Sequence, residues 1–554
     1  MRKSSAAIVA LASGAALSTV GCAGGTSPEK AIASITAEDI ARDDQVLASD
    51  SFGGRAPSSR GEELTINYLK GRFQDMGLQP GNGDSYFQEV PLVSIMLDPN
   101  TGLRIAGGGG TTTFEYGSEY MAWTKRVVES VELSGSEMVF VGYGVVAPEY
   151  DWNDYAGVDV KGKTVVMLVN DPGFASGDTT LFNGKSMTYY GRWTYKYEEA
   201  ARQGAAAALI VHETEPAGYP WEVVEGSWKG EQFDLESENG NMNRAKVEGW
   251  LTLESARKVF DQAGLDYDTL KAAAAKRGFE AVPMGLKASS TLHNTLRHST
   301  SHNVLAVLPG RDRPDEYVVY TAHWDHLGTK SGTAGDSIYN GALDNASGVA
   351  GLLALAGAFS SLSAPPQRSI LFMSVTAEEQ GLLGSKYYAT HPVYPLNKTV
   401  AEINMDGLDI WGPMKDITVI GYGQSKLDDY LAQAAQTQDR HLRPDPEPEK
   451  GFYYRSDHFE FAKQGVPALY TDAGIESVEH GEEWARQQRD AYTAERYHKP
   501  ADEYDPDWDL RGAVEDLQLL FRVGYRLVNE STFPNWKPGS EFKAKRDSMM
   551  RGAS

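Results

Sequence analysis

The sequence predicts an α/β fold, a three-layer sandwich around a mixed central sheet, interrupted by a mostly β insert. From residue 301 onward, short apolar runs rich in β-branched residues alternate with helical segments, as in a sheet that is covered by helices. Residues 127–290 instead contain short β-type runs between loops rich in Gly, Asp and aromatic residues. A chain of 554 residues also exceeds one typical core, so two or more domains are expected.

The composition indicates a soluble, loop-rich globular protein. Hydrophobic residues make up 41% of the chain and charged residues 23%, with 57 glycines. The net charge of −24 argues against nucleic acid as a partner, because phosphate binding requires a basic face. We interpret the acidity as a contribution to solubility.

Residues 1–22 are predicted to be a signal peptide of the lipoprotein type. Arg2 and Lys3 precede an apolar run at residues 6–20 that is too short to span a bilayer. The run ends in STVGC, which resembles a bacterial lipoprotein cleavage box with Cys22 as the lipidated residue. Export is therefore expected, to the periplasm or to a membrane anchored through Cys22; ordinary signal cleavage and secretion is the alternative. No later transmembrane helix is predicted.

Cys22 is the only cysteine of the chain. An intrachain disulfide, a cysteine nucleophile and a thiolate metal site are thereby excluded from the body of the protein.

The lead-in, residues 36–76, is predicted to form a helix, a loop and a second helix. Thr36 is the expected N-cap of a helix over residues 36–48, with Asp39 three positions later in capping-box spacing. A turn-rich loop follows at residues 50–57. Apolar residues then recur at helical spacing over residues 62–76, up to Gly77.

The later elements are assigned from the same periodicities. In the insert we expect strands at 131–133, 138–143, 164–169 and 206–211, and a helix at 195–203. In the C-terminal half we expect strands at 303–308, 317–322, 369–375, 400–405, 416–421 and 466–470, and helices at 347–362, 381–390, 426–436 and 510–529. The strands at 303–308 and 317–322 are expected to pair around a Pro-Gly-Arg-Asp turn. Residues 531–554 are expected to be a polar tail with little to pack.

Three of the predicted strands end in residues that commonly bind metals. His323 and Asp325 follow the strand at 317–322, Glu378 and Glu379 follow 369–375, and Asp406 follows 400–405. Sites in open α/β sheets form at the carboxyl ends of the strands. Asp344 opens a helix beside them and His498 lies in a late loop. This set of nitrogen and oxygen donors suits a pair of Zn²⁺ ions.

Each of these residues also has an ordinary structural explanation. Asp344 fits the N-cap of a helix, Glu378 and Glu379 fit a solvated pair, and Asp406 fits a turn before Gly407. The explanations are sufficient one at a time. They become improbable together, because all the residues fall at one edge of one predicted sheet.

Five segments resemble the di-zinc exopeptidase family, which includes bacterial leucyl aminopeptidases and glutamate carboxypeptidase. The resemblance covers residues 36–128 and 292–530, and the insert at 129–290 resembles a protease-associated domain. The segments that carry it are Ala322-His323-Trp324-Asp325, residues 341–348 (GALDNASG), residues 376–385 (TAEEQGLLGS), Asn404-Met405-Asp406-Gly407 and the late His498.

The resemblance implies a role for each of these residues. Asp344 bridges two zinc ions, His323 and Asp406 complete one metal site, and Glu379 and His498 complete the other. Glu378 is implied to be the general base, and Asp325 the carboxylate that orients His323.

The implied function is a zinc-dependent exopeptidase, foremost an aminopeptidase that acts on peptides outside the cytoplasm. Zinc lowers the pKa of a bound water to about 7, and Glu378 would take its proton and pass it to the leaving amine. A carboxypeptidase is an alternative, although no arginine cluster stands beside the ligands in the sequence. A glutaminyl-peptide cyclase is another, weakened by the complete ligand set. A non-catalytic peptide-binding protein is the third, opposed by the intact Glu378.

Three further signals lie around these ligands. Residues 455–458, Arg-Ser-Asp-His, are interpreted as a loop that holds the pocket, since adjacent residues cannot align as a catalytic triad. Tyr453 or Tyr454 is an option for an oxyanion donor, with core packing as the favoured interpretation. His326 is interpreted as a supporting or surface residue.

Overall fold

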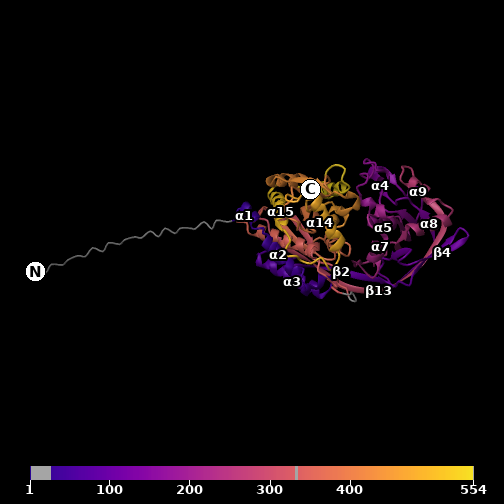
Figure 1. Cartoon of the computed structure of the whole chain (residues 1–554), viewed down its shortest axis with the longest axis horizontal. Helices are drawn as coiled ribbons and strands as arrows, with labels where there is room; N and C mark the ends of the chain where they lie inside the picture. The colour runs from indigo at the N-terminus through magenta and orange to yellow at the C-terminus, as the bar shows by residue number, and fades with distance from the viewer. Residues whose placement is uncertain (2–25, 331–334, 553–554) are drawn as a thin grey trace.

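The chain folds into two lobes that are joined by long strands, and Figure 1 shows β2 and β13 running between them. The computed structural model describes residues 1, 26–330 and 335–552. Residues 2–25, which include Cys22 and all of the predicted signal peptide after Met1, lie outside the described residues.

The first lobe is built on a mixed sheet. Hydrogen-bonded pairing gives the strand order β20-β19-β21-β18-β14-β17-β13-β2, in which β18, β14 and β17 are parallel neighbours. The strands are β1 (Gln79–Pro80), β2 (Phe87–Leu97), β11 (Glu231–Leu235), β13 (Val282–Leu308), β14 (Arg313–His323), β17 (Arg368–Val375), β18 (Thr399–Asn404), β19 (Asp416–Ile420), β20 (His441–Pro444) and β21 (Ala468–Asp472).

Helices cover this sheet, as the alternating pattern predicts. They are α1 (Pro28–Ala33), α2 (Ala37–Leu47), α3 (Arg60–Asp75), α10 (Gly348–Ser360), α11 (Leu383–Thr390), α12 (Leu427–Ala435), α13 (His458–Lys463), α14 (Gly481–Glu495), α15 (Arg511–Asn529) and α16 (Lys543–Arg551). The capping prediction is confirmed, because the Thr36 hydroxyl accepts a hydrogen bond from the Asp39 amide at 3.2 Å. Helices α2, α3, α10 and α15 contribute to one apolar core with β14 and β18.

The second lobe has its own sheet, with strand order β4-β3-β13-β6-β9-β10-β12-β5. Its strands besides β13 are β3 (Gly102–Gly107), β4 (Gly110–Glu115), β5 (Tyr120–Trp123), β6 (Ser130–Phe140), β9 (Thr164–Leu168), β10 (Ala207–His212) and β12 (Val247–Thr252). Its helices are α4 (Pro172–Ser176), α5 (Trp193–Arg202), α6 (Thr214–Ala217), α7 (Trp221–Trp228), α8 (Leu253–Gln262) and α9 (Tyr267–Ala274). The lobe is therefore less purely β than the sequence suggests.

The second lobe begins earlier than the predicted boundary at residue 129. Strands β3 and β5 pair with β13 and β12, and Leu103, Phe114 and Tyr120 are buried in the core of that lobe. Its two principal apolar clusters are separate from the core of the first lobe. The boundary was missed because the run at 102–123 is rich in Gly and Thr and carries little apolar periodicity.

Strand β13 differs most from the prediction. It spans 27 residues, and its first part pairs with β6 and β3 while its later part pairs with β2 and β17. The expected pairing of 303–308 with 317–322 is wrong, because β17 lies between them, antiparallel to β13 and parallel to β14. The polar stretch of β13 before residue 301 is partly exposed, so its composition resembles that of a loop.

The expectation of a loosely packed tail after residue 530 is also wrong. Trp536 and Arg546 are each 1% exposed, and Phe542 is buried. The Trp536 indole donates to the Gly465 carbonyl at 3.0 Å, so this segment closes over the first lobe.

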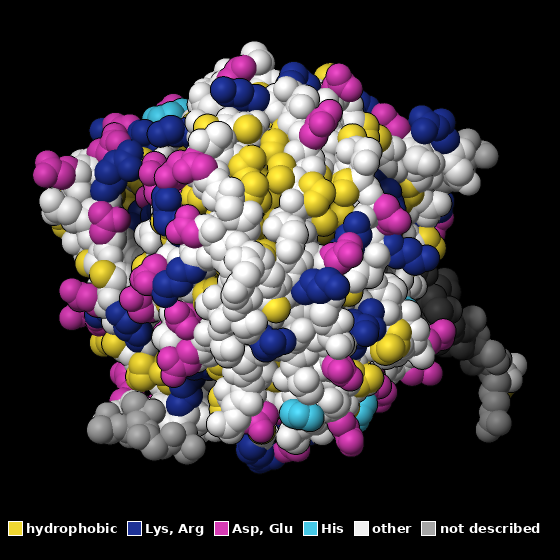
Figure 2. Space-filling view, turned by 90° about the vertical axis from the view of Figure 1, so that its right-hand side faces the viewer, with side chains coloured by type: hydrophobic (Ala, Val, Ile, Leu, Met, Phe, Trp, Pro, Cys, Tyr) yellow, Lys and Arg dark blue, Asp and Glu magenta, His cyan; other side chains and the backbone are white. Residues whose placement is uncertain are grey.

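One described helical segment, Ala342–Ser360, is long and apolar enough to cross a membrane by length and composition. It is 89% buried within the fold, as the central helix of a core is. The outer face of the second lobe, shown in Figure 2, carries Lys and Arg side chains interspersed with Asp and Glu.

Candidate metal centre

Three parallel strands deliver the predicted ligands to one edge of the sheet. His323 is the last residue of β14, Glu378 and Glu379 follow β17, and Asp406 follows β18. Because β17, β14 and β18 are adjacent and parallel, their carboxyl ends meet, as such sheets require.

Asp344 lies between two histidines that come from opposite sides. Its Oδ1 is 3.4 Å from His323 Nε2, and its Oδ2 is 3.1 Å from His498 Nε2. His323 Nε2 is also 3.2 Å from Asp406 Oδ1, and His498 Nε2 is 3.2 Å from Glu379 Oε2. The five predicted ligands therefore form two groups that share Asp344.

Asp344 is not the N-cap of the following helix. Helix α10 begins at Gly348 with Ser347 at its N-cap, and Asp344 has non-helical angles (φ −110°, ψ 92°) within the distorted turn η4 (Ala342–Ser347). Its amide donates to Asp502 Oδ2 at 3.1 Å. The carboxylate is thus free of a capping role and points at the two histidines.

His326 belongs to the centre and not to the surface. It is fully buried, and its Nδ1 lies 2.6 Å from Glu379 Oε1 without the alignment of a hydrogen bond. His326, Asp344 and Glu379 can together surround one ion, as can His323, Asp344 and Asp406. Gly341 leaves room for the imidazole ring of His326, because a Cβ at position 341 would lie 2.5 Å from two carbon atoms of that ring.

Asp325 contacts His323 mainly through its backbone. The Asp325 carbonyl lies 3.1 Å from His323 Nδ1, whereas the nearer carboxylate oxygen is 3.8 Å away. That carboxylate accepts the Glu378 amide at 3.0 Å. Asp325 therefore contacts His323 through its carbonyl and not through its carboxylate as predicted, and its carboxylate holds the backbone of Glu378.

The carboxylates of this centre form no ion pair with a lysine or an arginine in the described part of the chain. Among the described residues, the ion pairs of Asp325, Asp344, Glu378, Glu379 and Asp406 are formed with histidines only. Buried carboxylates need partners, and a mixed set of imidazole and carboxylate donors is the chemistry that Zn²⁺ accepts. The residues therefore fit bound divalent cations.

The pKa shifts of the two histidines and of Glu378 reflect the same excess of negative charge. Burial opposes protonation of His498, but Glu379 and Asp344 raise its pKa to about 9. For His323, burial is likewise outweighed by Glu378 and Asp406, which raise its pKa well above the ordinary value. Burial raises the pKa of Glu378 far above that of a free glutamate, with Asp406 and Glu379 adding to the effect. Both imidazoles thus lie in a field that attracts cations.

Two supporting contacts have no signal in the ligand pattern. Asp502 accepts the Leu343 and Asp344 amides, each at 3.1 Å, and so holds the backbone of the shared carboxylate. Ser456 donates to Asp406 Oδ2 at 2.6 Å and receives a bond from Asn404 at 2.7 Å. The Ser456 contact agrees with the prediction that residues 455–458 hold the pocket.

Arg55 ties the lead-in to the centre. The buried guanidinium donates to the carbonyls of Trp324, Asn340 and Gly341 at 2.6–2.8 Å, and to that of Leu47 at 2.8 Å. It therefore joins the segment after β14 to the segment before Asp344. This role was not predicted, because a single arginine in a turn-rich loop has no sequence pattern that indicates such contacts.

The loop before α13 packs as core. Tyr453 and Tyr454 are buried in an apolar cluster, and the Tyr454 hydroxyl donates to Glu541 at 2.9 Å. Neither is therefore placed as an oxyanion donor. Tyr497 is nearer the ligands, since its ring stacks on His498 with centroids 3.9 Å apart. Tyr497 is 44% exposed, and its partial burial together with the neighbouring carboxylate of Asp344 raises its pKa, so its hydroxyl stays protonated.

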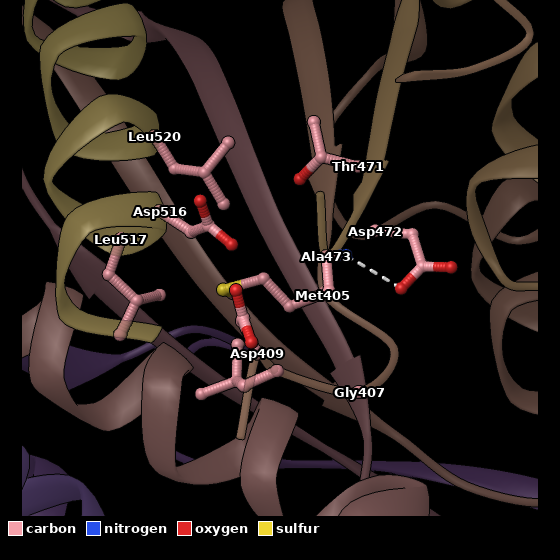
Figure 3. Close-up of a pocket in the computed structure, with 10 residues that line it drawn as sticks. Met405, Gly407, Asp409, Thr471, Asp472, Ala473, Asp516, Leu517 and Leu520 are labelled. Atoms are coloured by element: carbon pink, nitrogen blue, oxygen red, sulfur yellow. Dashed lines mark hydrogen bonds between the residues drawn. The ribbon is translucent and has the colours of Figure 1, made fainter. Parts of the chain in front are cut away.

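Behind the centre, on the side of α15, lies a small closed cavity of about 10 Å³ (Figure 3). Asp409 and Asp516 point into it, and Met405, Leu517 and Leu520 supply apolar walls. It has room for about one water molecule. It is therefore a feature of the core and not a substrate site.

Several known proteins resemble this chain in sequence. Residues 303–521 match the family model described as peptidase family M28. Mouse aminopeptidase NAALADL1 is 37% identical over 137 residues, a segment that spans 23% of this chain and only 17% of that protein. The probable leucine aminopeptidase 2 of Aspergillus oryzae is 26% identical over 491 residues, which cover 86% of this chain and 81% of the relative.

Among solved structures, an aminopeptidase from Aneurinibacillus sp. strain AM-1 has a similar fold. The TM-score is 0.50 with 20% sequence identity, over 92% of this chain and 97% of the other. The similarity therefore covers both lobes.

Proposed function

We propose that this protein, whose residues 303–521 match the model of peptidase family M28, is an exported, zinc-dependent aminopeptidase that removes N-terminal residues from peptides. The observation that carries the proposal is Asp344, whose two carboxylate oxygens each face a different histidine. A carboxylate placed in this way is suited to bridge two cations about 3.5–4 Å apart.

The two metal sites are assigned as follows. His323 and Asp406 would hold one zinc ion, Glu379 and His498 would hold the other, and Asp344 would contribute to both sites. When bound, zinc supplies a Lewis acid and lowers the pKa of a coordinated water. His326 packs against Glu379 and fixes the orientation of that carboxylate.

Glu378 is the proposed general base. Its Oε2 lies 4.0 Å from His323 Nε2, so the carboxylate faces the metal centre without the short contacts that Glu379 makes. Its amide is fixed by Asp325. Glu378 can therefore accept a proton from the attacking water and pass it to the leaving amine. The Tyr497 hydroxyl is proposed to donate a hydrogen bond to the developing oxyanion.

Substrates and location are inferred from other signals. Two relatives that span most of this chain carry aminopeptidase names, which favours cleavage at the amino end of peptides. Export through residues 1–22, with lipidation of Cys22, remains the proposal that the sequence suggests. Labelling of the expressed protein with a fatty-acid analogue, in wild type and Cys22→Ala, tests it: equal labelling of both would exclude lipidation.

Hydrolysis of aminoacyl p-nitroanilides before and after chelation tests the main proposal. We expect activity on free N-termini that is lost with chelator and restored by Zn²⁺, and no activity on acetylated N-termini. A chain that cleaves only acetylated peptides would be a carboxypeptidase. Failure to hydrolyse any peptide after zinc is restored would favour the binding-protein alternative.

Glu378→Gln tests the base assignment. The variant should keep its zinc but lose about 10²–10⁴-fold in kcat, the typical contribution of a general base. Metal analysis and initial rates measure both quantities. Glu482→Gln, a partly exposed glutamate on α14, is the matched control and should behave as wild type. Undiminished turnover in Glu378→Gln would remove Glu378 from the mechanism.

A further inference from the structure

Two arginines beside the centre lack partners for buried N–H groups. Arg192 is only 9% exposed, and its Nε has no hydrogen-bond partner. Arg455 has two such atoms, Nε and Nη2. Within the described part of the chain, no carboxylate forms an ion pair with either guanidinium. Buried donors are normally satisfied, so this pair requires an explanation.

The pair lies where the second lobe meets the candidate centre. Arg192 precedes α5, in a segment whose Met187 amide donates to the Pro448 carbonyl at 3.0 Å. The Tyr189 ring of that segment packs on Phe459 with centroids 5.1 Å apart. Arg455 immediately precedes Ser456, which donates to Asp406. The second lobe thus contributes one arginine close to the loop that supports a metal ligand.

The guanidinium charges of Arg192 and Arg455 repel each other. Burial and the neighbouring charge of Arg455 lower the pKa of Arg192 to about 10. Arg455 also faces two aromatic rings, with Cζ 5.4 Å from the Phe452 centroid and 6.0 Å from that of Tyr219. Cation–π contacts offset only part of the cost of a buried charge. A paired cationic site is unusual in a chain whose net charge is −24.

We propose that Arg192 and Arg455 together bind a carboxylate of the peptide substrate, namely the free C-terminal carboxylate of a short peptide. Guanidinium groups recognise carboxylates through paired, charge-assisted hydrogen bonds. Arg455 is one residue from Ser456, whose hydroxyl donates to Asp406, and on this ground we expect a short peptide bound at the centre to reach the two arginines. This inference rests on the proposed peptidase function and adds a specificity that depends on both lobes.

Paired substrates test the inference. We expect kcat/KM for Leu-Gly to exceed that for Leu-Gly-amide by about 10–100-fold, since one charge-assisted pair is lost in the amide. Arg192→Met and Arg455→Met should each bring this ratio close to one. Arg202→Met, on α5 and paired with Glu199 at 2.8 Å, is the matched control and should keep the wild-type ratio. A ratio near one in wild type, or one that neither variant changes, would overturn the inference.

Three further arms separate the remaining explanations. Equal preference for Leu-Gly and Leu-Glu-amide would assign the site to acidic side chains and overturn the C-terminal assignment. A role confined to folding predicts a lower Tm for Arg192→Met, whereas removal of an unpartnered charge should leave the metal-free Tm unchanged or higher. Cleavage of acetyl-Leu-Gly with the same dependence on Arg192 would support the carboxylate site while replacing the aminopeptidase function.

A binding measurement tests the carboxylate site without relying on turnover. If wild type hydrolyses no peptide, the proposed function fails. Calorimetric titration of the zinc-loaded Glu378→Gln protein with Leu-Gly and Leu-Gly-amide then decides the inference alone. A Kd for Leu-Gly at least tenfold lower, lost on adding Arg192→Met, supports the site. Equal Kd values overturn it.

Discussion

At the scale of single residues, the metal centre depends on where side chains lie relative to the ends of three strands. Asp344 places its two oxygens 3.4 Å and 3.1 Å from two histidines. Its backbone is held by Asp502 and, through Gly341, by Arg55. A shared carboxylate of this kind requires positioning from several segments, and the contacts that provide it are mostly to backbone atoms.

The proximity of the proposed ligands was predictable from sequence, while the contacts that support them were not. His323, Glu379 and Asp406 each follow an apolar run that ends at one sheet edge, so their proximity follows from topology. The role of Asp344 was partly mistaken, because an Asp before a small-residue helix resembles an N-cap and the cap is in fact Ser347. Asp502 has no pattern of its own, since backbone amides leave no trace in a sequence.

His458 provides a pH-dependent test at this scale. It is fully buried between the rings of Tyr453 and Tyr470. Burial lowers the pKa of His458 to about 3, against about 6.5 in the unfolded chain. As the pH falls below 6.5 the unfolded chain therefore takes up a proton that the folded chain does not, and stability falls.

The His458 imidazole is expected to lower the free energy of unfolding by about 2 kcal/mol between pH 7 and pH 5. Urea denaturation of metal-free protein at pH 7 and at pH 5 measures this loss. The loss of unfolding free energy should be about 2 kcal/mol smaller in His458→Phe than in wild type. His441→Phe, an exposed position on β20, should lose as much as wild type. Identical pH profiles for wild type and His458→Phe would contradict the assignment.

At the scale of elements, strand ends and loops were predicted with different success. The parallel strands were located because β17 and β18 are buried along their whole length and β14 is buried from Val318 to His323. Strand β13 was recovered only at residues 303–308, since before that point its exposed positions are polar and its alternation is interrupted. A buried strand can be recognised from its run of apolar residues. A partly exposed strand lacks such a run, and its formation depends on pairing with strands that are distant in the sequence.

Arg55 tests how the elements are joined. Arg55→Met removes four hydrogen bonds and leaves carbonyls of three segments without a donor. We expect the free energy of unfolding to fall by about 3–5 kcal/mol, measured by urea denaturation, together with weaker zinc binding. Arg60→Met, whose side chain is 74% exposed on α3, should change stability by less than about 0.5 kcal/mol. A stable Arg55→Met variant with normal zinc affinity would show that these contacts are dispensable.

At the scale of the whole molecule, two lobes with separate cores share β13 and meet beside the metal centre. The existence of an insert was predictable from the change in pattern near residue 127. Its true start was not, because β3 and β4 form a Gly- and Thr-rich hairpin. The C-terminal segment was misjudged for a related reason: few apolar residues suffice to anchor it, and Trp536 and Phe542 lie among polar neighbours.

The C-terminal segment is accordingly expected to contribute to stability. Trp536→Ala removes a buried indole that packs on Phe542, with centroids 5.0 Å apart, and donates to Gly465. A cost of about 3–5 kcal/mol is expected from such a truncation, measured by denaturant unfolding. Tyr422→Ala, at a side chain that is 49% exposed, should cost far less. A chain ending at residue 530 with undiminished stability would refute this role.

The central claim is that Asp344 joins two metal sites into one centre, and zinc stoichiometry measures this directly. After reconstitution and removal of free metal, wild type should retain two zinc ions per chain by elemental analysis. Asp406→Ala should retain one, Asp344→Ala close to none, and Asp429→Ala, exposed on α12, should keep both. Retention of both ions by Asp344→Ala, or of a single ion by wild type, would contradict the account.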